Sequence, residues 1–360
     1  MNFAQFLAAF PAATNHEPLV PGATGGLRYV AEGLPEFVGP DLAPSNEIQQ
    51  PSHAQIVIVS ASGAAGKSTL ANELALAKKV AIWDLALAEA VGANSMAGQL
   101  IQSFGPAGAA KIYARIAAGE TFFVIDALDE ATMKSNEAGF DAFIRNIATI
   151  ASTSAHTSFV LFARTQTARD TWLILDDAGI PTSLLAIQPF NREQAERYID
   201  ARIKHDKDPS AAKRIQEHRQ PFVAARDAIL QQLERAVVGD DATAEVASRE
   251  FLGYAPVLET VAVLLAKEKN PHELLTGLQA TTGVSTSDRP LLVLEHVVTR
   301  LLRREQVQKV QHNIRPALES TAAAVNWSSW DTLYSEEEQR LRLLGRILQK
   351  IGRASCRERV

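Results

Sequence analysis

The stretch from Gln55 to Leu70, QIVIVSASGAAGKSTL, constrains the fold of this chain more than any other. Four apolar residues, 56–59, predict a buried strand, and the small residues after them predict a loop. The apolar spacing of Leu70 and Leu74 then predicts a helix that begins near Lys67. A loop with few side chains, placed before a helix N-terminus, lets backbone N–H groups surround a phosphate. The stretch therefore predicts a phosphate-binding loop.

The residue order fits the Walker A pattern, G-x-x-x-x-G-K-[ST], except that Ala61 occupies the first glycine position. Alanine does not adopt the positive φ that glycine gives freely, so the turn is either altered or needs no such angle. Lys67 would contact the β- and γ-phosphates, and Ser68 would bind Mg²⁺. A plain glycine–alanine turn is the alternative. The candidate nucleotide-binding residues of the loop are Gly63, Ala64, Ala65, Gly66, Lys67, Ser68 and Thr69.

A second apolar segment, residues 122–125, ends in Asp126, and two more acids follow at Asp129 and Glu130. At the carboxyl edge of a parallel sheet, where ligands of such sheets bind, Asp126 could share a Mg²⁺ with Ser68. Asp129 or Glu130 could orient or activate a water against a γ-phosphate. The alternative is a strand that leads into an ordinary acidic first turn of a helix.

With these two motifs the chain resembles the STAND class of P-loop ATPases and, within it, the NACHT family, over roughly residues 53–265. The segment Asp126-Ala-Leu-Asp-Glu130 is similar to that family's Walker B motif, where a small residue follows the metal-binding acid. The resemblance implies that Arg164, at the end of another apolar strand, is a sensor 1 arginine that contacts the γ-phosphate; the alternative is a surface residue. It also implies that Pro256 packs on adenine; the alternative is a proline between helices.

Strands and helices alternate from residue 53 to 190, which predicts a P-loop nucleotide-binding domain with a parallel sheet covered by helices. Apolar residues at helical spacing follow and predict an all-α part. We divide this part into a helical domain, 191–283, and a truncated second helical or winged-helix-like region, 284–350. Residues 1–52 hold seven of the 16 prolines, which predicts an extended arm with one short helix near residues 2–9.

Both ends of the helical part carry a recognisable signal. Asn191 is predicted to cap its first helix, with Gln194 reaching back to the cap. Residues 351–360 resemble a translated sequencing-adapter read-through, so we expect a non-native tail that follows a fragment of a longer protein. A genuine basic tail is the alternative.

Composition narrows the classes of function. The net charge of −5 and the pI near 6.0 argue against a general nucleic-acid binder, whose affinity comes from a cationic surface. No run approaches the roughly 20 apolar residues that a membrane span needs. Cys356 is the single cysteine, so an internal disulfide cannot form, and we expect a cytoplasmic protein. The sequence shows neither zinc-ligand spacing nor a Gly-x-Ser-x-Gly elbow.

The resemblance implies a signalling switch that binds Mg-ATP, hydrolyses it slowly, and couples the nucleotide state to helical-domain rearrangement and oligomerisation. The expected cofactors are ATP and Mg²⁺. The expected partners are further copies of the chain and an unidentified trigger, sensed by a C-terminal region absent from this sequence. Two alternatives stay open: a nucleotide-locked scaffold, which Ala61 favours, and an AAA+-like remodelling ATPase. The acid pair Asp129 and Glu130 favours hydrolysis.

Overall fold

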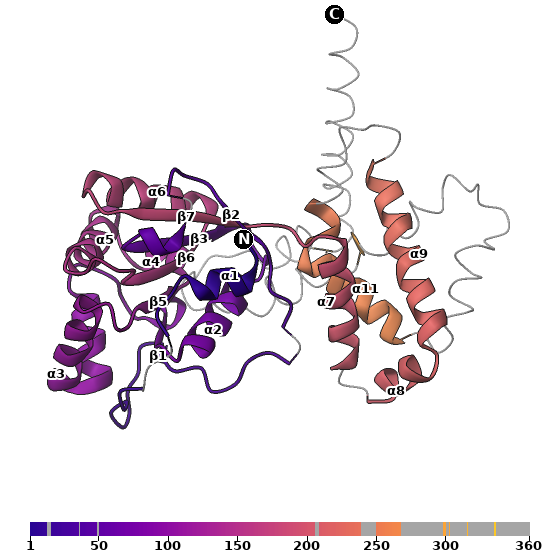
Figure 1. Cartoon of the computed structure of the whole chain (residues 1–360), viewed down its shortest axis with the longest axis horizontal. Helices are drawn as coiled ribbons and strands as arrows, with labels where there is room; N and C mark the ends of the chain where they lie inside the picture. The colour runs from indigo at the N-terminus through magenta and orange to yellow at the C-terminus, as the bar shows by residue number, and fades with distance from the viewer. Residues whose placement is uncertain are drawn as a thin grey trace, which may run out of the picture. The chain divides into compact units, whose positions relative to one another are not determined.

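The computed structural model describes residues 1–12, 16–35, 37–48, 50–205, 209–238 and 250–267, and the single residues 298, 299, 302, 315 and 335. The chain divides into two compact units, Met1–Ala201 and Arg202–Val360 (Figure 1). The expected second helical region, 284–350, lies almost entirely outside the described residues, and the expected tail, 351–360, lies entirely outside them.

A seven-stranded mixed sheet forms the centre of the first unit, in the order β1-β4-β5-β6-β3-β7-β2. Its central strands run parallel to one another: β4 (Ile82–Asp84), β5 (Phe123–Asp126), β6 (Phe159–Arg164), β3 (Ile56–Ala61) and β7 (Thr182–Ile187). The edge strands β1 (Leu27–Arg28) and β2 (Leu42–Pro44) are antiparallel to their neighbours. The expected α/β domain is confirmed, although its sheet is mixed.

Helices cover both faces of this sheet because its central strands are apolar on both sides. Side chains alternate along β3, so Ile56 and Ile58 join one core and Val57 and Val59 the other. The first core includes α3 (Ser95–Ala117), α4 (Leu128–Lys134), α5 (Glu137–Ala151) and α6 (Thr165–Asp177). The second includes α1 (Phe3–Ala8) and α2 (Lys67–Lys78). Short 3₁₀ helices occupy Pro51–His53 (η1) and Leu85–Leu87 (η2).

The N-terminal segment, 1–52, is built into the first unit. The short helix expected near its start is confirmed as α1, which Asn2 and Gln5 close with a reciprocal capping box. The segment also supplies both edge strands of the sheet. Phe6 is fully buried, and Phe10 stacks on Phe122 at a ring-centroid distance of 4.9 Å. The described part of the segment therefore packs as part of the sheet domain and not as a separate arm.

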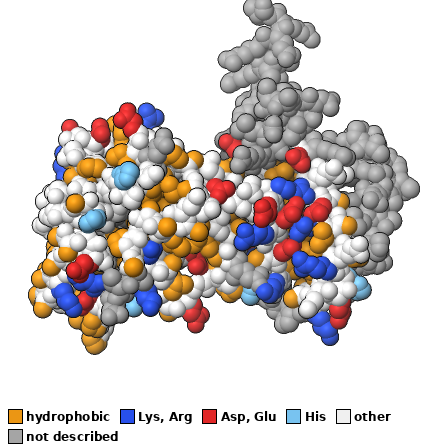
Figure 2. Space-filling view, viewed as in Figure 1, with side chains coloured by type: hydrophobic (Ala, Val, Ile, Leu, Met, Phe, Trp, Pro, Cys, Tyr) orange, Lys and Arg blue, Asp and Glu red, His pale blue; other side chains and the backbone are white. Residues whose placement is uncertain are grey.

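Four described helices follow the sheet: α7 (Arg192–Lys204), α8 (Pro209–Glu217), α9 (Arg219–Val238) and α11 (Ala255–Lys267). The expected cap of α7 is confirmed, because Asn191 and Gln194 exchange two hydrogen bonds of 2.9 Å. In the second unit α9 and α11 bury apolar side chains such as Leu233 and Leu258. Figure 2 shows cationic and anionic side chains intermixed there, and Arg202 pairs with Glu259 at 2.7 Å. Among the described helices, none has the length and apolarity to cross a bilayer.

Candidate functional site

The loop between β3 and α2 has the backbone geometry that a phosphate-binding loop needs. Gly66 has φ 84° and ψ 17°, in the left-handed region, and α2 begins at the next residue. Ala64 also has a positive φ, of 60°. Ala61, by contrast, is the last residue of β3 and pairs with Arg164 in the parallel ladder. The first position of the motif thus needs no positive φ here, which explains how alanine can replace glycine.

Two glycines of the loop have space where a side chain would lie. A Cβ atom added to Gly63 or Gly66 would meet no atom within 4 Å. The first turn of α2 brings backbone N–H groups to the same place, because the first four N–H groups of a helix have no acceptor within the helix. A helix N-terminus with space around it favours an anion. The described residues therefore leave space for phosphate oxygens beside these two glycines.

Lys67 folds back over this loop. Its Nζ atom donates hydrogen bonds to the carbonyl oxygens of Ala61 at 3.1 Å and Ser62 at 2.9 Å. Burial lowers the pKa of Lys67, and the nearby charge of Arg164 lowers it further, whereas Asp129 and Asp126 raise it. The ammonium group thus lies within electrostatic range of Asp126 at the end of β5 and of Asp129 in the first turn of α4.

Asp126 lies at the carboxyl end of β5, and its side chain is 4% exposed. Burial raises the pKa of this carboxyl, and the Asp84 charge raises it further. The nearby Ser68 hydroxyl lowers the pKa, as do the Ala127 backbone N–H and the Lys67 charge. The two residues expected to hold Mg²⁺ therefore lie near each other.

Asp84 is a site residue that the sequence analysis did not single out. It ends β4 and lies opposite Asp126 in the parallel ladder, at the same edge of the sheet. Its carboxylate accepts a hydrogen bond of 3.0 Å from the backbone N–H of Ala86. An apolar strand that ends in an acid was the signal available for Asp84, as it was for Asp126.

Arg164, at the end of β6, and Asp129, in the first turn of α4, form a two-point contact. The backbone N–H of Arg164 donates to Oδ1 of Asp129, and Nε of Arg164 lies 2.9 Å from Oδ2. The Arg164 side chain is 56% exposed, and that of Asp129 is 13% exposed. Both oxygens of Asp129 are therefore engaged. Glu130 lies half-buried in the first turn of α4, and its carboxylate makes no hydrogen bond with the described residues.

Two expected site residues lie away from these contacts. Thr69 is half-buried in the first turn of α2, next to Ser68. Pro256 is buried in the first turn of α11, in the second unit, where its carbonyl accepts a hydrogen bond from Thr260. The adenine contact of Pro256 stays a prediction.

The oxygen atoms at the sheet edge are of the kind that Mg²⁺ prefers. Among the described residues there is no group of three or more His, Cys, Asp or Glu side chains that could hold a metal alone. Mg²⁺ usually binds one or two carboxylates and takes its other ligands from water and phosphate. Ser68 and Asp126 therefore fit a metal that arrives with a phosphate group, and do not fit a permanent metal centre.

No family model and no curated protein matches the chain, so comparison with known proteins assigns it to no family. The site is thus defined by its own geometry. It combines an open loop before a helix N-terminus, a half-buried lysine, and a hydroxyl–carboxylate pair at one edge of an α/β sheet.

Proposed function

We propose that this protein is a cytoplasmic signalling switch that binds Mg-ATP and hydrolyses it slowly. The observation that carries the proposal is that the Ser68 hydroxyl lies close enough to the Asp126 carboxylate to lower the pKa of that carboxyl. These groups belong to different strand–helix turns, and they meet within range of the Lys67 charge. A buried acid, a hydroxyl and a lysine beside an open helix N-terminus are the groups that triphosphate binding requires.

Each group would have a distinct role in binding. The N–H groups of residues 63–68 would donate to phosphate oxygens. Lys67 would exchange its two carbonyl acceptors, on Ala61 and Ser62, for the β- and γ-phosphates. Ser68 and Asp126 would hold Mg²⁺, which would neutralise part of the phosphate charge. Binding would therefore replace weak neutral acceptors of Lys67 with charged ones.

For hydrolysis, the contacts favour Glu130 over Asp129 as the acid that orients water. Both oxygens of Asp129 accept hydrogen bonds or an ion pair from Arg164, so Asp129 would position that arginine. Glu130 makes no such contact among the described residues and lies only one residue further along. Arg164 would contact the terminal phosphate, because its exposed side chain lies at the same carboxyl edge of the sheet.

The switch itself rests on the resemblance to the NACHT family. By that resemblance, the nucleotide state would rearrange the helical domains and drive self-association. By the same resemblance, an unidentified trigger would control this rearrangement. Pro256, in α11, would pack on adenine in one of the two states.

Titration calorimetry with ATP, in the presence and absence of Mg²⁺, tests the binding step. We expect Mg²⁺ to strengthen binding to the wild type and to have little effect on Ser68→Ala, because the variant lacks the hydroxyl ligand. Ser62→Ala is the matched control, since Ser62 offers only its carbonyl to Lys67. An absence of ATP binding under both conditions would contradict the proposal.

Phosphate release separates the switch from the nucleotide-locked scaffold. Glu130→Gln should keep ATP affinity and lose at least ~100-fold in hydrolysis, the usual range for a lost general base. Glu137→Gln, on a different helix, should hydrolyse ATP at the wild-type rate. A wild type that binds Mg-ATP without releasing phosphate would support the scaffold, and equal rates for Glu130→Gln and the wild type would exclude Glu130 from the mechanism.

A further inference from the structure

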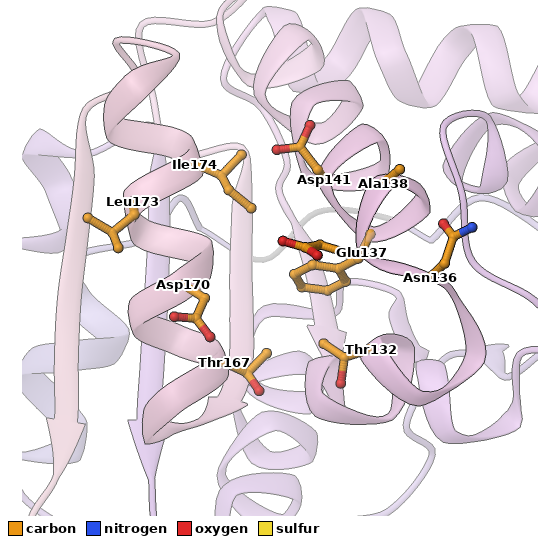
Figure 3. Close-up of a pocket in the computed structure, with 10 residues that line it drawn as sticks. Thr132, Asn136, Glu137, Ala138, Asp141, Thr167, Asp170, Leu173 and Ile174 are labelled. Atoms are coloured by element: carbon orange, nitrogen blue, oxygen red, sulfur yellow. The ribbon is translucent and has the colours of Figure 1, made fainter.

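A groove of about 1130 Å³ opens between α5 and α6 on the first unit, with the end of α4 at its rim (Figure 3). None of its lining residues belongs to the loop between β3 and α2 or to the acids at the sheet edge. The groove therefore includes none of the candidate nucleotide-site residues, but it lies beside that site, because the hydroxyl of Thr132 in its lining donates to the carbonyl of Asp129.

The groove offers apolar surface to a ligand. Phe140 of α5 lies beneath it and is 7% exposed, while Ile174 of α6 packs against the same core. Leu173, also in the lining, is 51% exposed. A large apolar side chain exposed in a concave site gains free energy when a partner covers it.

The charged residues of the lining are all acidic. Glu137 and Asp141 come from α5 and Asp170 from α6, and Figure 3 shows their side chains around the space between the two helices. Asp141 is paired with Arg145 at 2.8 Å, and Asp170 accepts a hydrogen bond from Gln166. No cation of the described residues forms an ion pair with Glu137 or Asp170. The groove thus keeps uncompensated negative charge beside its apolar floor.

We propose that this groove binds a cationic amphipathic helix of a partner protein. The partner's apolar face would cover Phe140, Leu173 and Ile174, as in other helix-in-groove complexes. Its lysines or arginines would pair with Glu137 and Asp170, which supplies specificity and speeds association. The same acids would repel anionic lipid and nucleic acid, so charge complementarity selects a basic protein segment.

Fluorescence anisotropy on the full chain tests this proposal with a labelled 18-residue peptide of leucine and lysine in helical amphipathic order. A peptide with glutamate in place of lysine and a peptide of scrambled order serve as ligand controls. We expect the lysine peptide to bind roughly tenfold or more tightly than either control, with affinity that falls as salt rises. Equal affinity for all three peptides would overturn the proposal.

Variants locate the binding surface. Glu137→Gln with Asp170→Asn removes the charge without an ion-pair partner, and Leu173→Asp removes the exposed apolar contact. Each change should lower the affinity for the lysine peptide roughly tenfold. The matched controls are Glu47→Gln with Glu89→Gln, and Leu87→Asp, which change exposed residues outside the groove. Controls should bind like the wild type. The proposal fails if groove variants with wild-type melting temperatures bind as tightly as the controls.

A second copy of the chain is the competing occupant. Sedimentation velocity at several concentrations distinguishes the two occupants. If a second copy fills the groove, Leu173→Asp should dissociate the oligomer, and the lysine peptide should not displace it. That result would overturn the assignment to a separate partner. Peptide binding with an unchanged sedimentation coefficient for Leu173→Asp would support it.

Discussion

The carboxylate of Asp126 is buried, and its burial lowers the stability of the folded protein. Burial raises the pKa of the group, because the charged form loses solvation. The Asp84 charge acts in the same direction, and only Ser68, the Ala127 N–H and Lys67 oppose it. A buried acid with a perturbed pKa beside a lysine and a hydroxyl is typical of a functional site. The free energy stored here would be released on binding a cation.

Asp126→Asn should stabilise the protein at neutral pH and weaken Mg-ATP binding. The folded-state pKa is raised above the unfolded value, so wild-type stability is favoured at low pH and is lost as pH rises through the folded pKa. The advantage of the asparagine variant should therefore shrink as the pH falls through that window. Urea unfolding at several pH values measures the difference. A variant that is less stable than the wild type at pH 7 would contradict this account.

Two alanines of the Walker A-like segment, Ala64 in the loop and Ala61 at the end of β3, give opposite expectations. Ala64 has φ 60°, so Ala64→Gly should stabilise the protein by about 0.5–1 kcal/mol through relief of left-handed strain. Ala61 is buried in β3, where glycine removes a packed methyl group, so Ala61→Gly should cost about 1 kcal/mol. Denaturant unfolding without nucleotide compares them. The loop geometry would be wrong if both variants changed stability in the same direction.

Single residues also show how much of the candidate site could be predicted from the sequence. It predicted Ser68 and Asp126 as partners, because the motif pattern assigns both to one metal. It did not predict that Asp129 would pair with Arg164, since each had been assigned to the phosphate separately and their spacing along the chain says nothing about contact. Asp84 was missed although its strand, like β5, is apolar and ends in an acid.

Among the elements, the central strands and the helices after them could be predicted, whereas the edge strands could not. Continuous apolar runs such as those of β3 and β6 are typical of strands buried on both faces. The edge strands β1 and β2 have two and three residues, too few for a period of two to appear. Their pairing depends on where β4 and β7 end, which local composition does not encode.

The N-terminal segment should be essential for stability. Phe6→Ala removes a fully buried ring whose centroid lies 5.0 Å from that of Phe10. The change should lower the free energy of unfolding by about 3–5 kcal/mol. Leu34→Ala, at a residue that is 56% exposed in the same segment, should cost less than about 0.5 kcal/mol. Urea denaturation provides both values. Similar small effects for the two variants would mean that the segment does not belong to the folded unit.

At the scale of the whole molecule, the strand order explains how distant segments form one site. β6 lies between β3 and β5, so the loop after β3, Arg164 after β6, and Asp126 at the end of β5 reach the same carboxyl edge. The alternation of strands and helices predicted a parallel sheet, but it did not specify this order, because several orders satisfy the same handedness of connection. The division into two units leaves Pro256 in the unit without the loop.

The central claim is that the edge of this sheet binds a nucleotide triphosphate through Lys67. A thermal shift of the full chain with Mg-ATP tests it most directly, with Lys67→Ala as the variant and Lys79→Ala, an exposed lysine at the other end of α2, as the control. Ligand at about 100 times its Kd should add about 2.7 kcal/mol of stability to the wild type and to Lys79→Ala, and almost none to Lys67→Ala. An equal shift in all three proteins, or no shift in the wild type, would contradict the account.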